Sequence, residues 1–374
     1  MSTTDNIFVL HGIISNTLNQ GGTLYCAFVD FKKAFDFVVR DILWYKLIKL
    51  GVRGKILEVI KSMYKCIKSR VKYMNTLSSE FSCYLGVRQG ECLSPFLFSM
   101  YLNDLEHEFV EKGVQGINVG MLNLCLLLYA DDIILLANSA ENLQNSLNVL
   151  ADYCTRWKLT VNTTKTKIMV FRKGGRLPNN LRFQYNNSEI EIVGKFKYLG
   201  IVFTSGGSFS ETDKTLSGQS LKAVFKLNSY LNKFTELSPK HILELFDKLI
   251  TPILNYSSEV WGFNKGSYIE RTHLKFCKRL LSVKQSTQNN FIYGETGRIS
   301  YIQRRYFNII KYWLKICCSQ NAKYIKIVYD NFMLKNNNET YRNNVILVSQ
   351  VKTLLSTLGF YKGSWGQKSF FINF

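Results

Sequence analysis

Residues 121–137 read MLNLCLLLYADDIILLA, and this stretch decides the fold of the first half of the chain. Apolar residues fill both sides of Asp131 and Asp132, which predicts two buried strands joined at Ala130-Asp131-Asp132. A carboxylate buried without a partner is costly, and two adjacent ones cost more. Water at a hairpin tip or a divalent cation would relieve that cost. Because Asp is also a common turn residue, the pair alone leaves an ordinary turn and a metal site equally open.

A second apolar stretch adds a third carboxylate. Residues 24–31 read LYCAFVDF and are apolar until Asp30. Two neighbouring strands that end in acids place their carboxylates at one edge of a sheet. A site of acids without His or Cys favours Mg²⁺, which prefers oxygen ligands. Two such ions, about 3.5–4 Å apart, suit an in-line displacement at phosphorus.

The composition indicates a nucleic-acid partner. The 374-residue chain carries 48 Lys and Arg against 27 Asp and Glu, a net charge of +21. Anionic lipid is the competing polyanion, but the basic residues are spread along the chain and not gathered on one amphipathic helix. The apolar segments are too short or too charged for a membrane helix, so we expect no membrane partner.

The cysteines and the first residues indicate where in the cell the protein is found. The nine cysteines form no CxxC pair and no zinc-type cluster, so we expect free thiols in a reducing compartment and no structural zinc. The first residues show no apolar run behind a basic stretch, so we expect no signal peptide. Together these features predict an intracellular protein, in the nucleus or the cytoplasm.

The chain changes character near Gly206-Gly207. Before it, helices are expected at residues 1–20 and from Ser94-Pro95 to about residue 110, and strands at residues 168–171 and 198–203. This pattern predicts an α+β domain built on an antiparallel sheet. Residues 208–330 have a helical pattern, with 19 Lys and Arg against 9 Asp and Glu. The tail beyond residue 330 stays unassigned.

Five short motifs, in order, carry a family resemblance. They are AFVDFKKAFD at 27–36, GVRQG at 86–90 followed by LSP at 93–95, YADD at 129–132, NTTKTK at 162–167 and YLG at 198–200. Their order and spacing resemble the reverse transcriptases of non-LTR (LINE-type) retrotransposons. The resemblance covers roughly residues 1–205, and Pro252, Tyr256 and Trp261 weakly resemble the thumb of the same group.

The resemblance implies a right-hand polymerase: an antiparallel palm sheet with helices on one side, then an all-α, thumb-like region. The implied domains are a fingers remnant at 1–22, the palm at 23–205, a basic helical thumb at 206–330 and an unassigned tail at 331–374. It also implies that Asp30 and Asp131 bind two Mg²⁺ ions, with Mn²⁺ as a possible substitute. Asp132 would contribute more weakly, and the backbone carbonyl of Phe31 would add a ligand.

The resemblance also assigns residues around the substrates. Phe35 would pack under the sugar and exclude a 2′-hydroxyl, a role that its place in the motif favours over the alternative of plain core packing. Gly90 and the other glycine of GVRQG would allow close backbone approach, Gln89 would hydrogen-bond the incoming nucleotide, and Arg88 would contact template or phosphate. Lys165 would protonate the departing pyrophosphate, with Lys167 as its substitute. A solvated surface lysine is the plain alternative for both.

The function implied is an RNA-directed DNA polymerase that takes an RNA template, a DNA primer and deoxynucleoside triphosphates. Only a short segment precedes Asp30, so the resemblance implies a chain truncated within the fingers, with weak or absent activity. The alternative is a nucleic-acid-binding remnant or co-opted element protein that has lost catalysis. A metal-dependent nuclease would also use clustered acids, but it would not explain GVRQG followed by LSP.

Overall fold

The computed structural model describes residues 2–233, 237–264, 266–318, 323–337, 346–357 and 359. Two compact units make up the chain. The sheet unit comprises Leu24–Val170 and Gly175–Val193, and the helical unit comprises Met1–Thr23, Phe171–Gly174 and Gly194–Phe374. The predicted palm, thumb and fingers boundaries are functional divisions, and they stay predictions.

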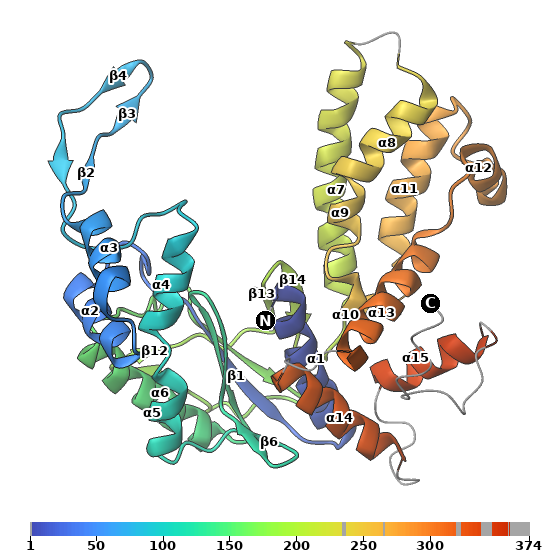
Figure 1. The fold of residues 1–374 in the computed structure, drawn as a ribbon. Coiled ribbons are helices and arrows are strands. Elements are labelled where there is room, and N and C mark those ends of the chain that lie inside the picture. Colours follow the sequence, from blue (N-terminus) through green and yellow to red (C-terminus); the bar gives the residue numbers. More distant parts are fainter. Residues whose placement is uncertain are drawn as a thin grey trace. The chain divides into compact units, whose positions relative to one another are not determined.

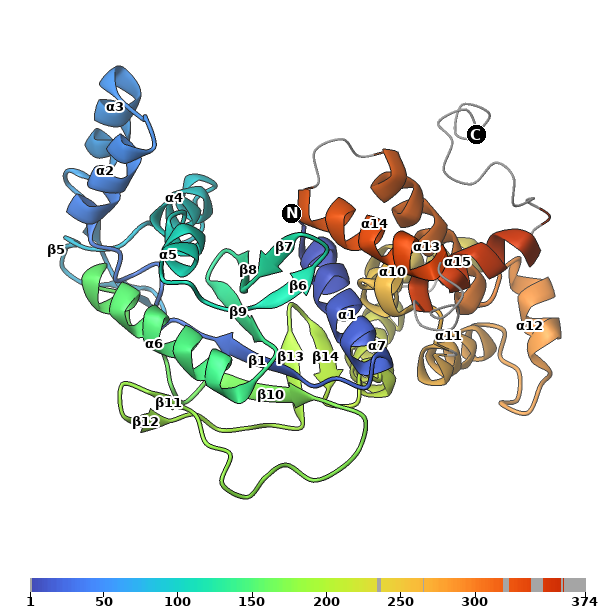
Figure 2. The same ribbon diagram turned by 90° about the horizontal axis from the view of Figure 1, so that it is seen from below.

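A four-stranded sheet forms the centre of the sheet unit (Figure 2). Its order is β10-β1-β9-β8, with bounds β1 Leu24–Val29, β8 Leu126–Tyr129, β9 Asp132–Ala137 and β10 Lys167–Phe171. β9 is antiparallel to both β1 and β8, as predicted from the two apolar strands. Cys125 interrupts the predicted long strand, and β7 (Leu122–Leu124) pairs instead with β6 (Ile117–Val119).

Helix α6 (Ala140–Arg156) covers one face of this sheet and contacts β1 and β9. It starts at Ser139, whose hydroxyl accepts a hydrogen bond from the amide of Asn142. Its buried stripe includes Leu143, Leu147 and Leu150, a spacing that places them on one side of a helix. The packing of α6 therefore buries one face of β1 and β9, the strands that lead to Asp30 and from Asp132. A small hairpin, β11 (Gln184–Tyr185) with β12 (Ser188–Glu189), packs beside α6.

The helix predicted from Ser94-Pro95 to about residue 110 is in fact two helices, α4 (Leu93–Tyr101) and α5 (Leu105–Glu111). Ser94 is not the N-cap, because the helix begins at Leu93 with Cys92 before it. The break between the helices carries Asp104, whose carboxylate accepts hydrogen bonds from the buried amine of Lys46 and from the Tyr153 hydroxyl. Asp104 therefore makes these hydrogen bonds from the turn between the two helices and not from within a continuous helix.

Helices α2 (Arg40–Lys49) and α3 (Gly54–Tyr64) complete the sheet unit, together with a projecting hairpin. We call residues 68–82 the arm. It contains β2 (Lys68–Ser69) paired with β5 (Phe81–Ser82) and, further out, β3 (Lys72–Tyr73) paired with β4 (Thr76–Leu77). Figure 1 shows the arm extending away from α2 and α3.

The helical unit begins with α1 (Thr3–Asn19), the first predicted helix. Ser2 caps it through a reciprocal pair of hydrogen bonds with Asp5. The strand predicted at 198–203 is wrong in one respect: it is a hairpin of β13 (Lys195–Tyr198) and β14 (Ile201–Thr204). Leu199 and Gly200 turn the chain with φ of 44° and 85°, a left-handed conformation that glycine adopts without strain.

The remainder of the helical unit is helical, as the sequence pattern predicts. Its helices are α7 Ser210–Leu231, α8 Pro239–Leu249, α9 Thr251–Leu254, α10 Ser258–Trp261, α11 Ser267–Leu280, α12 Asn289–Thr296, α13 Tyr301–Cys318, α14 Lys323–Asn337 and α15 Ile346–Thr357. Among the described residues, none of the helices combines the length and apolar character that a membrane crossing requires. Much of the unassigned tail, including residues 338–345 and 360–374, lies outside the described residues.

Candidate active site

Strand pairing brings the three predicted aspartates to one edge of the sheet. Val29 of β1 lies opposite Ile133 of β9, so Asp30 follows β1 at the level of Asp132, where β9 begins. Tyr129 pairs with Asp132 across the β8–β9 turn. Asp131 lies within that turn, next to Ala130 with φ of 51°. The three aspartates thus share one edge of the sheet, with Asp131 in the turn itself.

The three carboxylates influence one another. Burial, together with the negative charges of Asp131 and Asp30, raises the pKa of Asp132 to about 6. The Oδ2 atom of Asp30 is buried and accepts no hydrogen bond. A buried carboxylate oxygen without a donor is an energetic liability that a cation would remove. The donor set, all carboxylate oxygen, therefore fits Mg²⁺ or Mn²⁺ in chemistry.

The side chains do not lie in coordination geometry. Across the described residues, no three His, Cys, Asp or Glu side chains converge where they could hold a metal ion together. Mutual repulsion between neighbouring carboxylates opposes such convergence when no cation offsets it. The backbone, in contrast, already assigns Asp30, Asp131 and Asp132 to one edge.

The loop that carries NTTKTK holds Asp30 by its backbone. The Asn162 amide donates to the Asp30 carbonyl at 2.7 Å, and the Asp30 amide donates to the Thr166 hydroxyl at 3.1 Å. Thr166 is fully buried. Sequence reasoning missed this positioning role of Thr166, although the residue lies inside a quoted motif.

The same loop places Lys165 at the site. Its amine lies 4.0 Å from Oδ2 of Asp30, while the side chain remains largely exposed. Lys167, the substitute named from sequence, points elsewhere: its amine contacts the Glu191 carboxylate and the Thr164 carbonyl, both at 2.7 Å. Lys165 is therefore the lysine that the fold brings to Asp30.

Phe31 and Phe35 both pack on Phe98 of α4. The ring centroids lie 6.2 Å and 5.2 Å from that of Phe98, respectively. Phe31 is buried, whereas Phe35 is only half-buried. Phe31 also bridges to Val161, and the flanking hydrogen bonds use the Asp30 carbonyl and the Lys32 amide. The Phe31 carbonyl is not part of that bridge.

The GVRQG loop is fastened to the segment that follows Phe35. The Val87 amide donates to the Phe35 carbonyl at 2.8 Å, and the Gly86 amide donates to the Val38 carbonyl at 2.9 Å. Gly86 has φ of 82°, and a Cβ there would lie 2.6 Å from the Asp36 carbonyl oxygen. Glycine at this position is therefore a steric requirement of the close backbone approach.

The polar side chains of this loop have partners within the sheet unit. The Gln89 amide donates to the Asp36 carboxylate at 2.9 Å, so Asp36 has a pairing role. Arg88 donates to the Glu91 carboxylate and to the Met63 carbonyl. Gln89 and Arg88 remain exposed, as does Gly90 with φ of 90°.

A cleft opens beside this loop and reaches the base of the arm. It is lined by Asp36, Arg40, Ile67, Ser69, Cys83, Leu85, Gly86, Val87, Arg88 and Gln89.

The basic residues of the helical unit divide into two kinds. Lys275 and Arg279 are exposed on α11. Lys278 and Arg305 are buried, and the Lys278 amine donates to the Gln285 carbonyl at 2.8 Å. Arg304 pairs with Asp247. Buried Lys278 and Arg305 are structural, so they are not candidates for phosphate contact.

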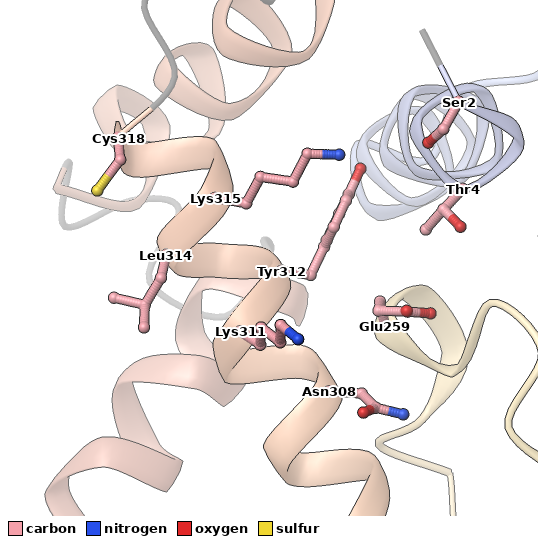
Figure 3. A pocket seen from close by; sticks show the side chains of 9 residues that line it. All are labelled: Ser2, Thr4, Glu259, Asn308, Lys311, Tyr312, Leu314, Lys315 and Cys318. Carbon is pink, nitrogen blue, oxygen red and sulfur yellow. The ribbon is translucent and has the colours of Figure 1, made fainter. Parts of the chain in front are cut away.

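A separate cavity lies in the helical unit, between α1, α10 and α13. Figure 3 shows Ser2 and Thr4 of α1 and its cap on one side, and Lys311, Tyr312 and Lys315 of α13 on the other. Glu259 lies within it, and one oxygen of its carboxylate is buried without a hydrogen-bond partner. Burial raises the pKa of Glu259.

The chain is similar to several mobile-element proteins. It is 24% identical over 262 residues to the RNA-directed DNA polymerase from mobile element jockey of Drosophila funebris, covering 68% of this chain and 28% of that protein. It is 30% identical over 215 residues to the Pol polyprotein from retrotransposable element R2 of Nasonia vitripennis, covering 54% of this chain and 20% of that protein. The chain thus spans less than a third of the length of these relatives.

Solved structures of telomerase are more distant. The telomerase of Candida albicans in complex with an RNA fragment aligns over 94% of this chain and 55% of its own, with 13% identity and a TM-score of 0.41. That likeness carries no weight for function. A model of the family described as reverse transcriptase (RNA-dependent DNA polymerase) matches residues 2–203. The predicted resemblance to retrotransposon enzymes and the predicted α+β polymerase class are confirmed. Because the match covers more than half of the 374 residues, the chain belongs to the reverse transcriptase family.

Proposed function

We propose that this chain is the RNA-directed DNA polymerase part of a retrotransposon protein, and that it extends a DNA primer on an RNA template from deoxynucleoside triphosphates. The observation that carries the proposal is the gathering of Asp30, Asp131 and Asp132 at one sheet edge, with Lys165 4.0 Å from Asp30. Nucleotidyl transfer needs concentrated negative charge that holds cations, and a proton donor for the leaving group.

In this proposal the metal site consists of the Asp30 and Asp131 carboxylates and the Phe31 carbonyl, with a smaller contribution from Asp132. When bound, two Mg²⁺ ions supply neutralisation of phosphate charge and a more acidic primer hydroxyl. Thr166 and Asn162 keep the Asp30 backbone fixed, because one accepts from its amide and the other donates to its carbonyl. Fixed ligands avoid reorganisation during the reaction.

The remaining residues position the substrates. Lys165 protonates the departing pyrophosphate, which it can approach because its side chain is exposed next to Asp30. Phe35 forms the floor under the sugar, and its ring is held by Phe98. Gln89 and Gly90 face the nucleotide, and Arg88 supplies positive charge to the template or a phosphate. Exposed basic residues of the helical unit, such as Lys275 and Arg279, contact the template–primer backbone.

Primer extension tests the proposal. With a DNA primer on an RNA template, deoxynucleoside triphosphates and Mg²⁺, we expect slow but measurable lengthening of labelled primer with the wild-type chain, in line with the weak activity that the sequence predicts. Asp131→Asn should lower the rate by at least about 100-fold, because a neutral amide is a poor cation ligand and the lost charge acts in a partly buried site. Asp152→Asn, at an exposed position of α6, should extend at the wild-type rate.

Two outcomes would contradict the proposal. One is extension by Asp131→Asn at the wild-type rate. The other is template–primer binding by the wild-type chain with no extension in either Mg²⁺ or Mn²⁺, which would instead identify a nucleic-acid-binding protein without catalysis.

A further inference from the structure

The arm presents two chemically different faces to solvent. Successive side chains of an extended strand point to opposite faces, so Lys68, Arg70 and Lys72 share one face. Lys68 and Arg70 both pair with Glu80, which agrees with this placement. Their counterparts Ser69, Val71 and Tyr73 lie on the opposite face.

The strand register adds Phe81 to that second face, because it pairs directly with Ser69. The face therefore carries two aromatic rings and a valine that are about half exposed or more. Tyr73 is 72% exposed, Val71 58% and Phe81 49%. We call Val71, Tyr73 and Phe81 the aromatic face. Apolar surface in such amounts on a projecting hairpin is unfavourable in water, which suggests a partner.

The aromatic face leads into the cleft beside the GVRQG loop. Ile67, Ser69 and Cys83 line that cleft, and alternation places them on the same side of the ribbon as the aromatic face. The Cys83 thiol donates to the Ser69 hydroxyl across the two strands. The cleft is then continued by Gly86, Arg88 and Gln89. The cleft thus extends from the candidate nucleotide loop to Ser69, at the base of the arm on the side of the aromatic face.

The charge of the arm selects the kind of partner. Lys68, Arg70 and Lys72 outnumber Glu80, so residues 68–82 are net positive. A two-stranded ribbon is a single layer, so the charges on its basic face lie within about 10 Å of a ligand on the aromatic face. That distance is about one Debye length at 0.1 M salt, so salt screens their attraction only in part. Exposed rings together with positive charge match a single-stranded nucleic acid, whose bases stack and whose phosphates are anionic.

We propose that the aromatic face binds an unpaired strand of nucleic acid, namely the template strand ahead of the base pair being formed, by stacking bases on Tyr73 and Phe81. This inference rests on the proposed polymerase function for the identity of the strand, but not for the binding itself. Unpaired RNA and unpaired DNA offer the same stacking chemistry, so both are probed.

Fluorescence anisotropy of labelled 15-nucleotide single strands, RNA and DNA in separate titrations, measures the binding by the full chain without nucleotides or metal. Removing a stacking ring weakens binding by about 5-fold to 150-fold per base. We therefore expect Tyr73→Ala and Phe81→Ala each to raise Kd at least about 5-fold. Lys72→Ala should reduce the dependence of log K on log salt by about 0.7.

Matched controls separate the arm from general effects. Phe307→Ala removes an equally exposed ring from α13, and Lys112→Ala removes an exposed lysine that follows α5; both should bind single strands as the wild type does. Circular dichroism should report the same fold for all variants, since Tyr73 lies on the surface and its loss leaves no cavity.

The outcomes separate this inference from the proposed function. Asp131→Asn should bind single strands with wild-type affinity but lose primer extension. Tyr73→Ala should bind single strands more weakly, and its extension should be impaired most on templates that have long unpaired 5′ ends. Unchanged affinity in both ring variants would overturn the inference and leave the polymerase proposal untouched. A change in sedimentation-derived oligomeric state with unchanged affinity would also overturn it, because the arm would then be a protein interface.

Discussion

Replacing Asp132 by asparagine should stabilise the chain while damaging its activity. Burial and two neighbouring carboxylates raise the pKa of Asp132 from 3.8 to about 6, so the folded state disfavours the charged form. The unfolded chain has no such penalty. Above about pH 6, ionised Asp132 lowers the free energy of unfolding by the full amount. Below about pH 4, Asp132 is protonated in both the folded and the unfolded state, and this loss of stability vanishes.

The size of the effect follows from the shift. A rise from 3.8 to about 6 corresponds to at most about 3 kcal/mol at pH 7. Because Asp132 is only half-buried, solvent screening reduces this to about 1–2 kcal/mol. For a domain of the size of the sheet unit, that change moves the melting temperature by about 2–8 °C.

The assay is thermal unfolding followed by circular dichroism between pH 4 and pH 8, with and without Mg²⁺. At pH 7, Asp132→Asn should melt several degrees above the wild type, and near pH 4 the two should coincide. Mg²⁺ should raise the wild-type melting temperature and narrow the difference, because a bound cation offsets the repulsion. Asp152→Asn, on the exposed side of α6, serves as the control.

Two results would refute the reasoning. If Asp132→Asn melts at or below the wild-type temperature at pH 7, the three carboxylates do not repel one another in the folded chain. If its stabilisation is the same at pH 4 and pH 7, the effect does not come from ionisation.

Three further substitutions probe the supports of the site. Thr166→Val keeps the side-chain shape but leaves the Asp30 amide without its acceptor, so we expect a loss of about 1–3 kcal/mol in urea unfolding and slower extension; wild-type stability would argue against that hydrogen bond. Gly86→Ala forces a Cβ to 2.6 Å from the Asp36 carbonyl at a left-handed φ, and should destabilise by about 1–3 kcal/mol, whereas Gly113→Ala, in open space at a similar φ, isolates the backbone strain alone. Lys165→Ala should slow single-turnover extension by about 100-fold or more with unchanged template–primer affinity, and an unchanged rate would remove Lys165 from the proton-transfer role.

Local patterns in the sequence were sufficient for most secondary structure. The apolar stretches at 24–31 and 121–137 predicted the central strands, because strands buried on both faces are apolar nearly throughout. The start of α6 is likewise a local feature, because the Ser139 hydroxyl satisfies a free helix amide. One error fell where a distant partner intervenes: Asp104 interrupts the predicted long helix and meets Lys46, which lies 58 residues earlier.

Burial decides the roles of residues that the sequence leaves open. Lys278 and Arg305 lie in a basic helical region, yet both are buried in the helical unit. The sequence shows a basic residue at each position but not which way its helix face turns. Conversely, Lys165 and Lys167 are two residues apart, and only the fold directs the first toward Asp30 and the second toward Glu191.

Ordered motifs and apolar strands ending in acids are local features, so the family could be recognised, and the three aspartates singled out, from the sequence alone. The position of Asp30 level with Asp132 depends on the register of strands about 100 residues apart, so it emerged only in the folded chain. Tertiary structure also decided that Thr166 holds the Asp30 amide and that the arm's aromatic face continues into the cleft. Hydrogen bonds and surfaces between distant segments exist only after the chain has folded, so no local pattern could have revealed them.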